Sequence, residues 1–188
     1  MPHTMITRIP VSSIGLPGHH SPGAGFEEPF DMLAACHERV VRMLSLLARL
    51  REHLSQKGWD ASVAQAAQDV MRYFDQAAPK HHDDEERHVF PALLAAPDTG
   101  LHAVVHRLQQ DHVDMAAGWA RARTVLTTLL DGPTTLDAAA HQVLADYAAL
   151  YDRHVEDEDK LVYPAAQRLL SAGDIEAMSA DMMARRGI

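Results

Sequence analysis

The sequence predicts an all-α protein: an antiparallel up-down four-helix bundle with an N-terminal arm and a short C-terminal helix. Hydrophobic residues make up 47% of the 188 residues, and most of them are Ala, Leu, Val and Met, which favour helices over strands. They recur at helical intervals in four long stretches. Turns containing Gly and Pro separate these stretches, and short turns place successive helices antiparallel. We therefore assign residues 1–28 to the arm, 29–170 to the bundle and 171–188 to the short helix.

The boundaries of the first two helices follow from local signals. Residues 1–28 hold four prolines and four glycines without a sustained apolar period, so we expect an irregular arm there. A helix of about 25 residues is expected to begin at Pro29 and to end near Gly58. Asp60 is placed to cap the second helix. Pro79 removes a backbone donor, so we expect a break or kink at that point.

Two further turns define the other helices. Residues 97–100 read Pro-Asp-Thr-Gly, which predicts a turn before the third helix. Residues 131–133 read Asp-Gly-Pro, with Thr134 or Thr135 expected to cap the fourth helix. That helix is expected to close at residues 171–174, and a short helix follows to about Arg185.

Charge and composition exclude several function classes. The chain carries 17 Lys and Arg against 26 Asp and Glu, a net charge of −9, and lacks a basic cluster for nucleic acid. No apolar run approaches the roughly 20 residues that cross a bilayer, and the first residues lack a signal-peptide layout. The single cysteine, Cys36, favours a reducing compartment. We therefore expect a cytoplasmic protein with no nucleic-acid or membrane partner.

The most unusual feature is a repeat among the 13 histidines. Two segments each place a glutamate four residues and a proline ten residues after a histidine: His81, Glu85 and Pro91, and His154, Glu158 and Pro164. Residues four apart share one face of a helix. Each segment therefore projects an imidazole and a carboxylate in the same direction.

The repeat also includes a lone histidine on the preceding helix. His37 precedes His81 by 44 residues, and His112 precedes His154 by 42. Lone helical histidines are usually solvated, and a charged run usually forms an outer face. Two copies with matching flanks are harder to explain in that way, because unpaired buried carboxylates are costly. We interpret the repeat as an internal duplication that brings four histidines and two glutamates together.

This donor set predicts a metal centre. Mixed imidazole and carboxylate donors suit iron or manganese best, and the chain has no cysteine cluster for a zinc–thiolate or iron–sulfur site. Six donors exceed the four of a structural zinc site, so two ions bridged by Glu85 and Glu158 fit better. Glu38, Asp111 and Glu156 either orient the imidazoles from outside or are ordinary surface charges.

At these residues the chain resembles the hemerythrin family, the HHE cation-binding domain, over about residues 29–170. The resemblance implies two iron ions, Fe²⁺ or Fe³⁺, joined by an oxo or hydroxo bridge, with Mn or Zn as substitutes. It implies that the four histidines are terminal ligands and that Glu85 and Glu158 bridge. The Phe90-Pro91 and Tyr163-Pro164 steps also match the family pattern.

One departure bears on function. Oxygen-carrying hemerythrins have a His-x3-His pair on the third helix, whereas Leu108 and Ala116 flank His112 here. About two of roughly 12 octahedral positions then stay open, unless another side chain fills one; the candidates are His82, His88, Glu86 and a tyrosine.

The resemblance implies a non-enzymatic module that binds or senses O2, NO or iron, which we favour. It also leaves open an enzyme that handles peroxide or nitrosative stress, since the donor set is similar to that of repair-of-iron-centres proteins. Those proteins carry paired cysteines in an additional N-terminal module, and this chain has only Cys36. A metal-stabilised structural bundle without small-molecule chemistry is the third alternative.

Overall fold

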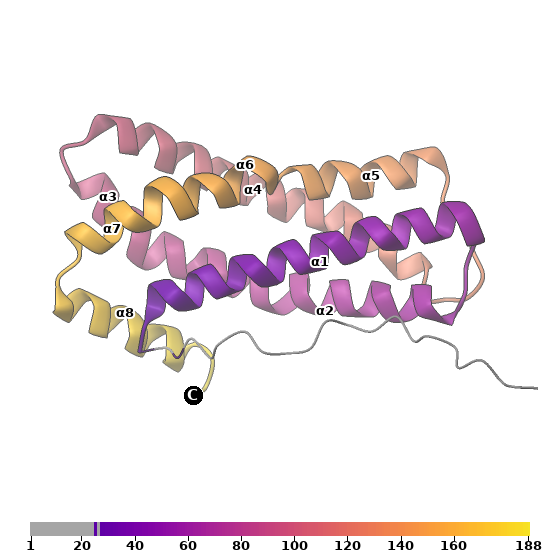
Figure 1. Ribbon diagram of the computed structural model, residues 1–188, viewed down its shortest axis with the longest axis horizontal. Helices are drawn as coiled ribbons and strands as arrows, with labels where there is room; N and C mark the ends of the chain where they lie inside the picture. The colour runs from indigo at the N-terminus through magenta and orange to yellow at the C-terminus, as the bar shows by residue number, and fades with distance from the viewer. Residues whose placement is uncertain (1–24, 26) are drawn as a thin grey trace, which may run out of the picture.

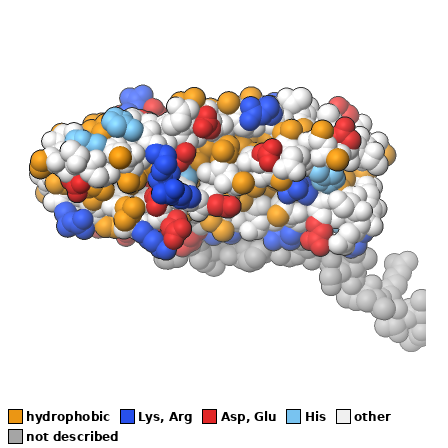
Figure 2. All heavy atoms as spheres, turned by 90° about the horizontal axis from the view of Figure 1, so that it is seen from above, with side chains coloured by type: hydrophobic (Ala, Val, Ile, Leu, Met, Phe, Trp, Pro, Cys, Tyr) orange, Lys and Arg blue, Asp and Glu red, His pale blue; other side chains and the backbone are white. Residues whose placement is uncertain are grey.

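The computed structural model describes Gly25 and residues 27–188, and all regular structure in these residues is helical (Figure 1). The arm expected over residues 1–28 lies almost entirely outside the described residues. None of the described helices combines the length and apolar character needed to cross a membrane. On the face shown in Figure 2, acidic and basic side chains are intermixed.

The first two helices lie side by side and have the expected ends. Helix α1 (Pro29–Lys57) begins with a proline at its first position and stops at Gly58, whose φ of 78° suits glycine. Helix α2 (Ala61–Asp84) is capped by Asp60, whose side chain accepts a hydrogen bond from the Ser62 backbone N–H. Both predicted signals, the glycine stop and the aspartate cap, are confirmed.

The sequence predicted a break or a kink at Pro79, and the structure shows no break. Helix α2 continues through Pro79 to Asp84 and passes directly into a π-helical turn, η1 (Glu85–Val89), and then into α3 (Phe90–Ala95). Ala78 and His81, on either side of the proline, are both buried. We attribute the continuous helix to this packing, which offsets the cost of the missing backbone donor.

The cap expected for the fourth helix is also wrong. Helix α4 (Thr99–Thr128) is capped by Asp98, within the predicted turn. Helix α5 (Ala138–Ala149) is capped by Asp137, whose carboxylate accepts the N–H of Ala140. Neither Thr134 nor Thr135 caps it, because the helix begins after Asp137 and the N-cap oxygen must reach the N–H groups of the first turn.

The remaining chain is helical but interrupted. After a short turn, α6 (Asp152–Asp157) leads into a second π-helical turn, η2 (Glu158–Val162), and then into α7 (Tyr163–Leu169). Helix α8 (Ala172–Ala184) follows, and its N-cap Ser171 forms a reciprocal capping box. The predicted stop near residues 171–174 is therefore also the start of α8.

Two apolar clusters fill the interior. One is built mainly from α1, α2, α4 and α5, and the other from α3, α7, α8 and the near ends of α1 and α4. On α1, His37 lies between Leu33 of the second cluster and Val40 of the first; on α4, His112 lies between Leu108 and Met115 in the same way. The predicted polar residues therefore form a layer between two apolar cores.

Candidate metal centre

The structure brings together all six residues predicted from the repeat. They come from α1, α2, η1, α4, α6 and η2, and none is more than 8% exposed: His37, His81, Glu85, His112, His154 and Glu158. Both glutamates are the first residues of the π-helical turns. Single π turns within helices are frequent at functional sites.

Four of these residues form the first cluster, defined as His37, His81, Glu85 and Glu158, whose ligand atoms all lie within 4.8 Å of one another. The two Nε2 atoms of His37 and His81 are 3.0 Å apart. His37 Nε2 lies 3.1 Å from Glu158 Oε2, and His81 Nε2 lies 3.3 Å from Glu85 Oε1. Two imidazoles and two carboxylates therefore converge on one point that a cation can occupy.

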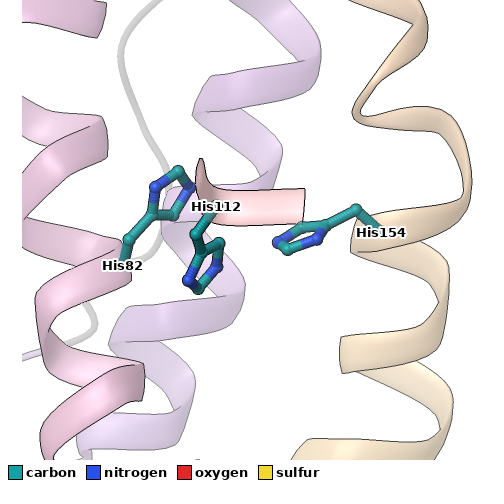
Figure 3. Close-up of side chains that lie close together, drawn as sticks. All are labelled: His82, His112 and His154. Carbon is teal, nitrogen blue, oxygen red and sulfur yellow. The ribbon is translucent and has the colours of Figure 1, made fainter. Parts of the chain in front are cut away.

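Three histidines form the second cluster: His82, His112 and His154, again within 4.8 Å. They reach inward from α2, α4 and α6 (Figure 3). The His82 ring stacks on the His112 ring with centroids 4.1 Å apart. The sequence left His82 open as an additional donor, and the structure places it here. Its counterpart in the second repeat is Val155, so the duplication gave no signal for it.

The two glutamates connect the clusters. Glu158 directs Oε2 at His37 and Oε1 at His154 Nε2, 3.1 Å away. Glu85 directs Oε1 at His81 and Oε2 at His112 Nε2, 3.5 Å away. Each carboxylate thus presents one oxygen to each cluster, the arrangement that a carboxylate bridging two ions requires.

Carboxylates outside the clusters orient the imidazoles. Asp159 lies 2.8 Å from His37 Nδ1 and Glu86 lies 2.9 Å from His112 Nδ1, which leaves each Nε2 facing the cluster. Asp159 directly follows Glu158, and Glu86 directly follows Glu85. Asp111 lies 3.3 Å from His154 Nδ1. Such contacts fix the tautomer and the ring orientation of a metal-binding histidine.

Of the three carboxylates suggested from sequence for this role, only Asp111 performs it. Glu38 pairs with Arg42 and Glu156 with Lys160, each one helical turn along its own exposed face. Asp159 was missed and Glu86 was considered only as a metal donor. Their position one residue after Glu85 and Glu158 was the available signal. His88, another candidate donor, instead contacts Asp181 on α8.

In the centre, burial and neighbouring charges shift the pKa values of the histidines and glutamates in opposite directions. Burial favours neutral His37, but the nearby carboxylates of Asp159 and Glu158 raise its pKa to about 10. Burial likewise opposes charge on His112, yet the nearby Glu85 raises its pKa to about 9. Burial also opposes ionisation of Glu158, but the imidazoles of His154 and His37, each 3.1 Å from one of its oxygens, hold its pKa well below the usual range.

Several buried atoms of the centre lack hydrogen bonds. Among the described residues, seven buried side-chain N or O atoms have no hydrogen-bond partner, and six belong to this centre: His81 Nδ1, Glu85 Oε2, His112 Nε2, His154 Nε2 and both Glu158 oxygens. Unsatisfied buried polar atoms are costly. Five of the six face the shared space of the two clusters, so cations coordinated there would satisfy them.

Comparison with known proteins identifies the family. The family described as hemerythrin HHE cation binding domain matches residues 28–166. The chain belongs to the hemerythrin family. A relative from Haemophilus influenzae, an uncharacterized protein, is 32% identical over 166 residues, covering 88% of this chain and 94% of its own length. The family resemblance drawn from the repeat is therefore confirmed, and with the His and Glu clusters it indicates a metal-binding hemerythrin-like protein.

A surface cavity gives access to one side of this hemerythrin centre. It has a volume of about 650 Å³ and lies between α1 and the η2–α7 segment. His37, Tyr163, Phe30 and Asp159 are among the residues that line it. The cavity therefore lies directly against His37, one residue of the first cluster.

Proposed function

We propose that this hemerythrin-family chain holds two iron ions and uses them to bind or sense O2 or a related small molecule such as NO. One observation carries the proposal: Glu85 and Glu158 each present one oxygen to each of two histidine clusters. A single ion would not require two carboxylates that each direct their two oxygens at different clusters. Five buried atoms without hydrogen bonds that face the space between the clusters give further support for cations there.

The donor assignment follows from the two clusters. His37 and His81 would hold one ion, and His82, His112 and His154 the other, with both glutamates shared. Mixed nitrogen and oxygen donors support iron or manganese, and zinc can occupy the same donors. We also infer that the long helices form an up-down four-helix bundle around this layer, as short connections favour.

The chain's own groups prepare the site for such chemistry. Iron, when bound, supplies the electrons that a small oxidant such as O2 accepts. Asp159 and Glu86 hold the His37 and His112 rings in place. The apolar clusters on both sides of the polar layer keep bulk water out. The cavity beside His37 admits a small ligand. The single cysteine supports a cytoplasmic location.

The test is the optical response of the iron-loaded, reduced protein to O2 and to NO. We expect a change in the visible spectrum on adding either gas, and we expect His81→Ala to abolish it because the first cluster loses a donor. His106→Ala is the matched control, since His106 is exposed and its ring lies 3.3 Å from the Gln109 side chain, away from both clusters. Its response is expected to equal that of the wild type.

Two results would contradict the proposed role. An iron-loaded protein whose spectrum is unchanged by both gases would be a structural metal protein. Release of O2 from added peroxide, present in the wild type and lost in His81→Ala, would instead indicate the alternative of a di-iron enzyme that handles peroxide.

A further inference from the structure

Tyr163 lies directly against the first cluster. It is the first residue of α7, immediately after the π-helical turn that begins at Glu158. The side chain is 5% exposed. Its ring stacks on the His37 ring, with centroids 5.3 Å apart and an interplanar angle of 13°. This stacking fixes the direction in which the hydroxyl points.

The Tyr163 hydroxyl oxygen lies as far from the donor atoms of the first cluster as a further metal ligand would. Tyr163 Oη donates a short hydrogen bond to Glu85 Oε1 and lies 3.1 Å from His37 Nε2. Neighbouring donors at roughly 2.1 Å from an octahedral ion lie roughly 3.0 Å apart. The distances already given within the first cluster, 3.0 to 3.3 Å, have this spacing. Tyr163 Oη therefore fits the same donor shell.

We propose that Tyr163 is a metal ligand, whose phenolate oxygen binds the ion held by His37 and His81. The inference rests on the proposed two-metal centre. On coordination the phenol O–H bond breaks, a metal–oxygen bond forms and the proton leaves to solvent; no electron is transferred. In the absence of a cation, burial and the charge of Glu85 hold the pKa of Tyr163 well above its usual value. A bound cation reverses this balance, because it stabilises the anionic form of its ligand.

Comparison of the two repeats shows that only the first cluster has a tyrosine at this position. Phe90 is the counterpart of Tyr163, nine residues after His81 as Tyr163 is after His154. Phe90 stacks on His112, with centroids 5.5 Å apart, but has no hydroxyl. That side has His82 in its place. The two metal positions are therefore unlike: a phenolate completes one and a third imidazole the other. Phenolate is a hard anionic donor, so it favours the ferric ion at the first position.

The other three tyrosines of the chain contact different groups. Tyr147 and Tyr151 are hydrogen-bonded to each other through their hydroxyls, 3.0 Å apart. Tyr73 donates to the backbone oxygen of Cys36. An iron–tyrosinate signal from this protein can therefore be assigned to Tyr163 by a single substitution.

The test is the visible and resonance Raman spectrum of the iron-loaded, air-oxidised protein, with iron content measured on the same sample. We expect an intense phenolate-to-iron charge-transfer band and, on excitation within it, tyrosine ring vibrations that shift with ring-deuterated tyrosine. Tyr163→Phe is expected to remove the band while iron is still bound, since the histidines and glutamates remain. Tyr147→Phe, a buried tyrosine outside the centre, is expected to keep the band.

The outcomes separate this inference from the proposed function. If the wild type holds iron but shows no tyrosinate vibration, or if Tyr163→Phe keeps the band, Tyr163 is only a hydrogen-bond donor to Glu85 and the inference is wrong. If the wild type holds no iron, the proposed iron centre fails and the inference with it. Should Tyr163→Phe fail to fold, the shift with ring-deuterated tyrosine in the wild type still decides whether a tyrosine is bound.

Discussion

Removing the metal with a chelator is expected to lower the free energy of unfolding by about 3 kcal/mol for each bound ion, under conditions where the free metal was present at about 100 times its dissociation constant. For a chain of this size, each kcal/mol shifts the melting temperature by about 2–4 °C, so we expect a decrease of about 6–12 °C for each ion. The physical cause is the buried carboxylate pair of Glu85 and Glu158, which a cation neutralises in the folded state alone. Thermal unfolding followed by circular dichroism measures this decrease.

The matched control is a chain that cannot hold the metal. In the double variant His81→Ala and His154→Ala, each cluster loses one imidazole. The chelator is expected to leave the melting temperature of this variant unchanged. If the wild type also melts at the same temperature with and without the chelator, the described clusters do not bind a metal that contributes to stability.

Asp84→Ala is expected to cost about 3 kcal/mol of unfolding free energy. Asp84 is only 1% exposed and accepts hydrogen bonds from Arg185 and Arg186, which follow α8. These contacts attach the C-terminal end of the chain to α2, directly before the π-helical turn. Removing the carboxylate leaves two partly buried guanidinium groups without this partner, and an unpaired buried charge is strongly destabilising. Urea unfolding followed by fluorescence measures the loss.

The adjacent residue provides the control. Asp83 also contacts Arg185, but its side chain is 41% exposed. Asp83→Ala is therefore expected to cost less than about 1 kcal/mol, as exposed ion pairs usually do. If both substitutions lower the free energy of unfolding equally, the buried Asp84 does not hold the C-terminal segment more strongly than the exposed Asp83.

The sequence predicted the helical class and the six clustered residues because both follow from local periodicity. Apolar spacing depends on 3.6 residues per turn, and a His-x3-Glu pair shares one helix face at any position in a fold. The duplication added the information that the two pairs belong together. The aspartate cap of α2 was equally local, and Asp60 was found for that reason.

The parts that sequence reasoning missed depend on contacts between helices. Helix α2 passes through Pro79 because packing on both sides holds it. His82 joins the second cluster only because α4 brings His112 against it. The duplication is also imperfect: Asp111, before His112, orients His154, whereas its counterpart Cys36 leaves His81 Nδ1 without a hydrogen bond. Residue spacing alone does not show which differences between the two repeats change the site and which have no effect on it.

The central claim is that two metal ions lie between the clusters, and the direct test is the metal-to-protein ratio measured by elemental analysis of the purified protein. The account predicts two ions per chain. It further predicts that His82→Ala weakens retention of one of them, whereas His88→Ala, which removes a histidine bonded to Asp181 instead, retains both. A ratio of one or less after expression with abundant iron would contradict the two-metal centre.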